Sequence, residues 1–258
     1  MNFVVGNGLT THFKLEGTGD GAPLVFINAL GTDLRIWDGV VSHLTSYHPV
    51  LRFDKRGHGL SDCPPAPYSI RSFSADLLDM LNQLEISQAI VVGISVGGMI
   101  AMDFAACWPE RVLSMILCDT APVIGTANSW NDRIDGVRKN GMESMAPAIL
   151  ARWFAPTFKN KSPAAYQGYY NMLTRMPVEG YIGTCEAIRD ANLTEAARTV
   201  EAPTLILCGA EDVSTPPGLV QGLTELISNA EYHEIPGAGH SICIEQPDAV
   251  AEQIKRFL

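Results

Sequence analysis

The chain has 258 residues, with a formal net charge of −10 at pH 7 and a sequence pI near 5.0. This length suffices for one α/β domain, with or without an inserted subdomain. The acidic balance argues against nucleic acid or an anionic membrane as the main partner, and it requires a local positive patch for any anionic ligand. Because no apolar run approaches ~18 residues and no secretory signal is visible, we expect a cytoplasmic protein.

Strands and helices alternate through the first half of the chain. We expect an opening hairpin with strands at Phe3–Val5 and His12–Leu15. Short buried strands should follow at Leu24–Asn28, Val50–Phe53, Ala89–Val92 and Val112–Cys118. Helices are expected between them at Trp37–Leu44, Ile70–Leu84 and Val96–Cys107. This alternation predicts the α/β class, with a mostly parallel sheet and helices on both faces.

The alternation stops near Pro122. From there to Leu193 the chain is rich in Trp, Tyr, Met and Arg and shows no clear strand, which predicts an inserted helical cap. Strands resume at Thr204–Cys208 and Tyr232–Ile235, and a helix is expected at Asp248–Leu258. We therefore predict a core formed by residues 1–121 and 194–258, with residues 122–193 as the cap.

The stretch GISVG, from Gly93 to Gly97, places a serine between a predicted strand and a predicted helix. Glycine on both sides of Ser95 leaves room for the strained turn that projects a nucleophilic hydroxyl, the G-x-S-x-G nucleophile elbow. A dinucleotide-binding turn needs glycine where Ser95 stands, and a P-loop needs a Lys-Ser or Lys-Thr pair that is missing here. A tight packing turn with an incidental serine is the remaining alternative.

A serine nucleophile needs a general base, and that base needs a carboxylate to hold its tautomer. In this architecture the chain order is serine, acid, histidine, with each residue following a strand. Asp212 and His240 each lie just after one of the last two predicted strands. We therefore predict a catalytic triad of Ser95, Asp212 and His240. Glu211 is a rival for the acid, and His58 is a rival for the base.

Backbone amides should form the oxyanion hole, one from the residue after the nucleophile and one from the loop that follows Leu24–Asn28. We predict Val96 and Leu30 as these two donors. An ordinary strand-to-helix turn is the alternative for the loop. The six cysteines show no C-x-x-C spacing, so the sequence favours neither a zinc site nor a disulfide framework.

Taken together, the chain resembles an α/β-hydrolase with a cap, and more closely the 3-oxoadipate enol-lactone hydrolases of the β-ketoadipate pathway. The resemblance rests on INALGTDLRIWD (Ile27–Asp38), LRFDKRGHGLSD (Leu51–Asp62), VVGISVGGM, ARWFAPTF (Ala151–Phe158), YIGTCEAIRDANL (Tyr181–Leu193) and HSICIEQP (His240–Pro247). The elbow and the RGHG loop are typical of the superfamily, whereas the two cap segments are more specific to the lactonases. Many relatives begin the oxyanion loop with His-Gly, and this chain instead has Asn28-Ala29.

The resemblance implies hydrolysis of an enol lactone that carries a carboxymethyl arm, through an acyl-enzyme and without a metal or an organic cofactor. A broad-specificity carboxylesterase and a carbon–carbon bond hydrolase would use the same triad. A ligand-binding receptor would use the same scaffold without turnover. A haloalkane dehalogenase is disfavoured, because its nucleophile is aspartate and this elbow carries serine.

An anionic lactone as the partner requires a cation near the nucleophile. The candidates are Arg35, Arg133, Arg138, Arg152, Arg175 and Arg189. Trp130 and Arg133 are three residues apart on an expected helix, so they should share a face on which the indole walls the ring and the guanidinium binds the carboxylate. We predict these two residues, together with Trp153 of the ARWFAPTF segment, as substrate-binding residues. The oligomeric state stays open, and a homodimer is one option.

Overall fold

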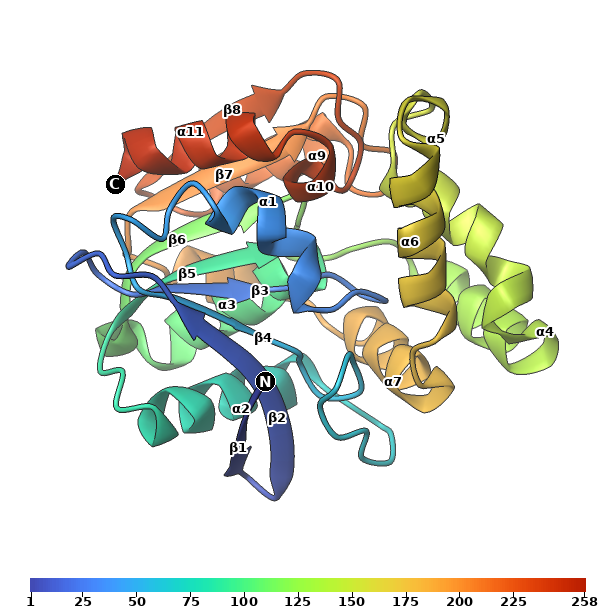
Figure 1. Ribbon diagram of the computed structural model, residues 1–258, viewed down its shortest axis with the longest axis horizontal. Helices are drawn as coiled ribbons and strands as arrows, with labels where there is room; N and C mark the ends of the chain where they lie inside the picture. Colours follow the sequence, from blue (N-terminus) through green and yellow to red (C-terminus); the bar gives the residue numbers. More distant parts are fainter.

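An eight-stranded sheet runs through the computed structural model, which describes residues 1–258 (Figure 1). Its strands are β1 (Asn2–Gly6), β2 (Leu9–Glu16), β3 (Leu24–Ile27), β4 (Val50–Phe53), β5 (Ala89–Ile94), β6 (Val112–Cys118), β7 (Thr204–Gly209) and β8 (Ala230–Ile235). Their spatial order is β1-β2-β4-β3-β5-β6-β7-β8. β2 is antiparallel to both neighbours, and all the other pairs are parallel. The predicted mostly parallel sheet is confirmed.

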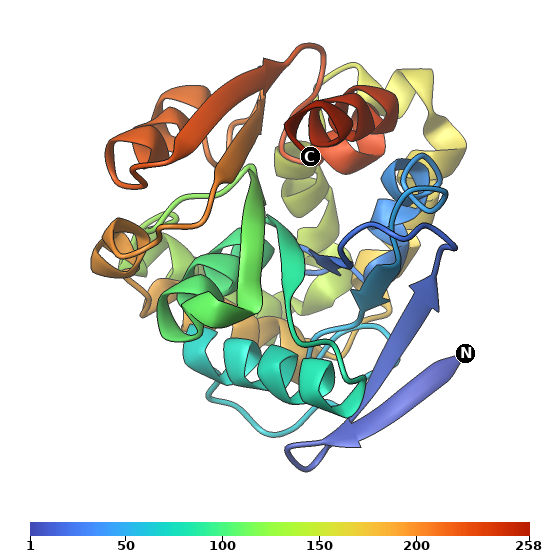
Figure 2. The same ribbon diagram turned by 90° about the vertical axis from the view of Figure 1, so that its left-hand side faces the viewer.

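Helices cover both faces of this sheet (Figure 2). The helices of the core are η1 (Leu34–Trp37), α1 (Asp38–Val41), α2 (Ile70–Gln83), α3 (Val96–Cys107), η2 (Pro109–Arg111), α8 (Thr194–Arg198), α9 (Pro217–Gln221), η3 (Gly222–Glu225), α10 (Ile242–Glu245) and α11 (Pro247–Phe257). Along β3, Val25 and Ile27 join the hydrophobic cluster that contains α2 and α3, whereas Leu24 and Phe26 join the cluster that contains α1 and α11. Burial of alternate side chains on both faces explains why these strands are continuous apolar runs.

The expected helix at Trp37–Leu44 differs from the structure. A 3₁₀ turn, η1, comes first, and α1 then ends at Val41. Asp33 starts η1, because its side chain accepts a hydrogen bond from the backbone N–H of Arg35. Sequence periodicity alone does not distinguish such a short 3₁₀–α combination from a single helix.

Four helices and no strand lie between β6 and α8, in residues 122–193. They are α4 (Ala127–Trp153), α5 (Phe158–Lys161), α6 (Pro163–Thr174) and α7 (Val178–Arg189). They lie beyond the carboxyl ends of the parallel strands, where open α/β sheets bind ligands (Figure 1). The backbone N–H of Leu193 donates to the carbonyl of Pro122 at 2.9 Å, so the two ends of this segment meet. We call residues 122–193, with helices α4–α7, the cap, and their assignment as a separate domain stays a prediction. None of the helices is both long and apolar enough to cross a membrane.

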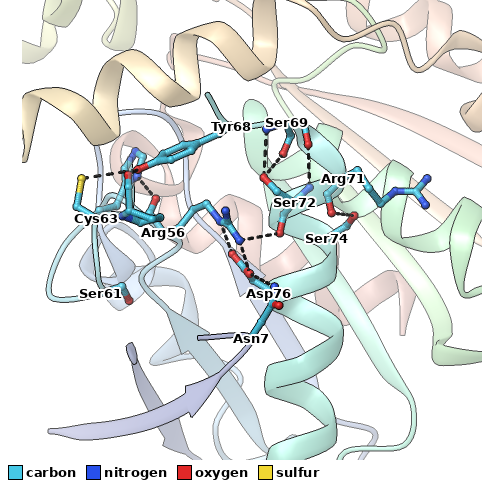
Figure 3. A network of polar contacts seen from close by, with 12 residues as sticks. Asn7, Arg56, Ser61, Cys63, Tyr68, Ser69, Arg71, Ser72, Ser74 and Asp76 are labelled. Carbon is cyan, nitrogen blue, oxygen red and sulfur yellow. Dashed lines mark hydrogen bonds and ion pairs between the residues drawn. The ribbon is translucent and has the colours of Figure 1, made fainter. Parts of the chain in front are cut away.

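A polar network fastens the loop after β4 to helix α2 (Figure 3). The guanidinium of Arg56 donates to both carboxylate oxygens of Asp76, at 2.6 Å each, and the side chain of Asn7 donates to the same carboxylate at 3.1 Å. Further along the loop, the Tyr68 hydroxyl donates to the carbonyl of Pro64 at 2.6 Å, and its ring lies 5.6 Å from the guanidinium of Arg56. Such a bidentate pair is geometrically demanding, so the network holds this loop in one position.

Candidate active site

Ser95 occupies the turn between β5 and α3. Its φ of 57° and ψ of −122° are strained for a residue with a side chain, and strain of this kind is typical of functional sites. The flanking glycines are required by close packing: a Cβ on Gly93 would lie 2.2 Å from the carbonyl oxygen of Gly97, and one on Gly97 would lie 2.3 Å from that of Ile27. The Thr120 hydroxyl donates to the carbonyl of Ser95 at 2.7 Å and helps to hold the turn. This arrangement is that of a nucleophile elbow.

His240 and Asp212 lie together on the loops that follow β8 and β7. The two atoms Nδ1 of His240 and Oδ2 of Asp212 are 2.8 Å apart, and both side chains are buried. Asp212 also accepts hydrogen bonds from the backbone N–H groups of Ser214 (2.6 Å) and Thr215 (3.1 Å) and from the Thr215 hydroxyl (2.7 Å). Burial alone would raise the pKa of Asp212, but His240 and these donors lower it. A carboxylate held in this way fixes the imidazole with Nε2 free to act as a base.

Glu211 and His58, the alternative acid and base, lack the contacts that Asp212 and His240 make. Glu211 is exposed, and no ion pair or hydrogen bond joins its side chain to a histidine. His58 is buried, and both ring nitrogens are engaged: Nε2 accepts the N–H of Gly31 at 3.2 Å, and Nδ1 donates to the carbonyl of Arg56 at 3.0 Å. Burial, together with the charge of Lys55, lowers the pKa of His58 well below its usual range. His58 is therefore a neutral side chain that supports the oxyanion loop.

Ser95 and His240 line one cavity of about 160 Å³ between the sheet and the cap helices, without a direct hydrogen bond between them. The other residues of the wall are Ala29, Leu30, Ile124, Gly125, Ser129, Trp130, Arg133, Arg152, Trp153 and Ser214. The predicted nucleophile, base and loop donor thus share this cavity with all three predicted substrate-binding residues. Asp212 does not line the cavity, and it contacts Nδ1 of His240.

Two amides are available as oxyanion donors. Leu30 lines the cavity, and its N–H donates to no acceptor within the protein. Val96 is the first residue of α3, where a helical N–H has no intrahelical partner. Both N–H groups are consequently free to bind an anion that forms on a substrate at Ser95.

Arg133 and Arg152 take no part in any ion pair, in contrast to most of the other candidate arginines. Arg35 pairs with Asp33, Arg138 with Glu186 and Arg189 with Asp190. The guanidinium of Arg133 lies 5.3 Å from the ring centroid of Trp130, so these two side chains share one face of α4. Partial burial and the charge of Arg133 lower the pKa of Arg152. The cavity therefore holds two neighbouring cations that lack a counter-ion.

Sequence reasoning placed Arg152 among six candidates and did not select it. The distinguishing information is tertiary: Arg138 and Arg189 find carboxylates on α7 and just after it, whereas Arg152 finds only the carbonyl of Val213, at 3.2 Å. Its position beside Trp153 was the one available sequence signal.

A second buried carboxyl, Asp119, adjoins Asp212 and was not anticipated. Its Oδ1 accepts the N–H of Gly209 at 2.8 Å, and its Oδ2 has no partner. Burial and the charge of Asp212 raise the pKa of Asp119 well above its usual range. Asp119, Cys208 and Asp212 are close enough to hold a metal ion. However, the oxygens of Asp212 are already engaged by His240 and the loop donors, so this donor set does not fit a metal site.

Known proteins share this architecture. A family model described as the α/β hydrolase fold matches residues 22–247. The chain is 34% identical to 3-oxoadipate enol-lactonase 2 of Acinetobacter baylyi, over 95% of this chain and 93% of that protein. It is 30% identical to 3-oxoadipate enol-lactonase 1 of the same organism, over 97% and 94% of the two chains. The crystal structure of the enol-lactonase from Burkholderia xenovorans matches with a TM-score of 0.96 at 33% identity, over 99% of both chains. The chain belongs to the α/β-hydrolase family.

Proposed function

We propose that this hydrolase opens 3-oxoadipate enol-lactone to 3-oxoadipate, a step of the β-ketoadipate pathway of aromatic catabolism. The observation that carries the proposal is the pair of arginines without counter-ions, Arg133 and Arg152, in the same cavity as Ser95 and His240. An ester substrate that also bears a carboxylate fits this combination. The similarity to enol-lactonases over almost the whole chain supports the same substrate class.

In the first half of the reaction, the hydroxyl of Ser95 attacks the lactone carbonyl while Nε2 of His240 takes its proton. Asp212 stabilises the imidazolium that forms. The negative charge on the former carbonyl oxygen rests on the amides of Leu30 and Val96. When the carbonyl re-forms, the bond to the ring oxygen breaks, and His240 returns its proton to the departing enol oxygen. An enol oxygen is a better leaving group than an ordinary alkoxide. The released enol then becomes the ketone.

In the second half, His240 removes a proton from water, which attacks the acyl-enzyme carbonyl in the same oxyanion hole. The ester bond to Ser95 then breaks, and His240 returns the proton to the serine oxygen. The product has two carboxylates, one of them newly formed at Ser95. The charge-assisted hydrogen bonds from Arg133 and Arg152 hold the product in the cavity. Release of the product therefore requires that water and dissolved anions replace these hydrogen bonds.

Binding of the substrate is assigned to the cap side. The indole of Trp130 is fixed by donation from Nε1 to the carbonyl of Ile124 at 2.6 Å, so it offers a rigid wall for the lactone ring. Trp153 is buried at the same cavity and supplies a second wall. Arg133 receives the carboxylate, with Arg152 close enough to share it.

The test follows the loss of ultraviolet absorbance of the enol lactone with purified protein, alongside hydrolysis of a neutral aryl ester. A charged hydrogen bond contributes about 1.5–3 kcal/mol, so kcat/KM for the lactone should exceed that for the neutral ester by about tenfold to hundredfold. Equal values, or a preference for the neutral ester, would favour a broad-specificity carboxylesterase. Saturable binding of the lactone without turnover of either compound would favour a receptor.

A further inference from the structure

The carbonyl oxygen of Ala29, in the oxyanion loop, is surrounded by donors. Nζ of Lys55 donates to it at 2.6 Å, the hydroxyl of Thr32 at 2.9 Å and the backbone N–H of Thr32 at 3.4 Å. Lys55 is 2% exposed and takes part in no ion pair, and this carbonyl is its one hydrogen-bond acceptor in the protein. A buried amine without a contacting carboxylate, directed at one carbonyl, requires a reason, because burial of such a group is unfavourable.

That carbonyl and the proposed oxyanion donor belong to the same peptide group. The C=O of Ala29 and the N–H of Leu30 are joined by amide resonance, so a strong donor at the oxygen withdraws electron density from the nitrogen and makes its N–H a better donor. The contact also fixes the orientation of the peptide plane. In the buried loop, where the effective dielectric constant is low, such polarisation is stronger than in water.

The next peptide group is held in a different way. The N–H of Gly31 is bound to Nε2 of the neutral His58, which is itself fixed through the carbonyl of Arg56. The N–H of Leu30, in contrast, has no acceptor in the protein and lies at the cavity. Burial lowers the pKa of Lys55 well below its usual range, but the amine and the ammonium both carry N–H groups for Ala29.

We infer that Lys55 is a positioning residue of the oxyanion hole: it polarises and orients the Ala29–Leu30 peptide so that the Leu30 amide binds the tetrahedral oxyanion more tightly. Lys55 neither touches the substrate nor transfers a proton. The inference rests on the proposed function only in using Leu30 as an oxyanion donor, and it holds for any ester cleaved at Ser95. Thr32 acts on the same oxygen and should contribute in the same direction.

The test compares Lys55→Met, which keeps the volume and removes the donor, with Thr32→Val and with the exposed control Lys139→Met. Loss of a whole oxyanion donor lowers kcat about 10²–10³-fold, so loss of its polarisation should lower kcat for a neutral aryl ester about tenfold, with KM changed less than about twofold. A boronic acid forms a tetrahedral adduct on Ser95, and its inhibition constant should rise by a similar factor. The inhibition constant of adipate, which forms no adduct, should stay constant. Thr32→Val should show a smaller change of the same kind, and Lys139→Met none.

Two results would overturn the inference. One is an unchanged affinity of Lys55→Met for the boronic acid. The other is a parallel loss of affinity for the boronic acid and for adipate with a raised KM, which would make Lys55 a packing residue of the loop. If Lys55→Met does not fold, Thr32→Val decides by the same two measurements. Because a neutral ester is used, failure of the wild-type protein to open the enol lactone would count against the proposed function and leave this test intact.

Discussion

On the core side of the cavity, Asp212 and His240 are buried and bound to each other, whereas on the cap side Arg133 and Arg152 have no ion-pair partner. Asp212 and His240 are thus joined before a substrate arrives, whereas no hydrogen bond joins His240 to Ser95. The cap group carries two like charges whose repulsion an incoming anion would relieve. Under the proposed function, this difference assigns bond cleavage and substrate selection to separate parts of the molecule. Substitutions on the core side should therefore affect all esters equally, and substitutions on the cap side should affect charged ones.

The largest effect is expected for Ser95→Ala. Loss of the nucleophile should lower kcat by about 10⁴-fold or more for both the enol lactone and a neutral aryl ester. The side chain lies at the tip of a turn, so circular dichroism and thermal unfolding should show a folded protein. Retention of activity on one of the two substrates would mean that a second nucleophile exists, and the comparison of the two sides would fail.

Asp212→Asn should be almost as severe, with a loss of about 10⁴-fold, because the amide favours the wrong imidazole tautomer. Glu211→Gln is the matched control, since Glu211 precedes Asp212 directly and points to solvent. It should keep kcat within about twofold. The same logic applies to the histidines: if His58→Ala lowers kcat as much as His240→Ala while both proteins stay folded, the assignment of the base is wrong.

Arg133→Met tests the cap side. It should raise KM for the enol lactone by about tenfold or more, given about 1.5–3 kcal/mol for a charged hydrogen bond. Steady-state kinetics with the neutral ester should be nearly unchanged. Arg138→Met, on the same helix but paired with Glu186, is the control and should leave both substrates unaffected. Equal losses on charged and neutral substrates would show that Arg133 supports the fold.

Arg152→Met sharpens the same point with a smaller effect, about threefold to tenfold on KM, because Arg152 is more exposed and exposed ion pairs are weak. If the two guanidinium groups share one carboxylate, the double variant should lose less than the sum of the two single losses in binding free energy. Strict additivity in this double-mutant cycle would place the two arginines on different groups of the substrate.

The smallest effect concerns Glu245, which joins the two sides. Its carboxylate accepts the N–H of Ala155 in the cap at 3.0 Å and that of Gly239, beside His240, at 2.8 Å. Burial raises its pKa from 4.5 to about 7. The folded state thus binds more protons than the unfolded chain between these values, so this contribution to stability is full below pH 4.5 and is lost as pH rises through about 7.

Glu245→Gln should remove that decline. Denaturant unfolding at pH 5 and at pH 8 should show the difference in unfolding free energy between the two pH values shrink by on the order of 1 kcal/mol, after allowance for solvent screening. An unchanged difference would mean that Glu245 titrates alike in the folded and unfolded chains.

Much of the core was predictable from local sequence. The helix expected at Val96–Cys107 coincides with α3, and the one expected at Ile70–Leu84 differs from α2 by one residue. Both follow short apolar strands or clear caps, where local propensity and burial agree. The hairpin and the buried strands were predicted for the same reason. The break of α4 at Gly141, where φ is 76°, was by contrast not predicted, because an isolated glycine in a helical pattern is not a reliable signal of a break.

The cavity was less predictable, because its properties depend on which partners distant residues find. The hydrogen bond from Gly31 to His58 spans 27 positions, and it turns a rival base into a support of the oxyanion loop. Likewise, an arginine becomes available to a ligand only when no carboxylate lies near it, as at Arg133. Sequence spacing carries little information on the role of His58 or on the availability of Arg133, since tertiary contacts decide both.

The hydrogen bond between Leu193 and Pro122 has an evolutionary consequence. The two ends of residues 122–193 are adjacent. The whole segment can therefore be exchanged or lengthened without shifting the register of β6 against β7. A single recombination event at this point would change the substrate range of the protein and leave Ser95, Asp212 and His240 unaltered. A chimera that carries the segment between these residues from an esterase of neutral substrates should lose the preference for anions and keep its hydrolytic activity.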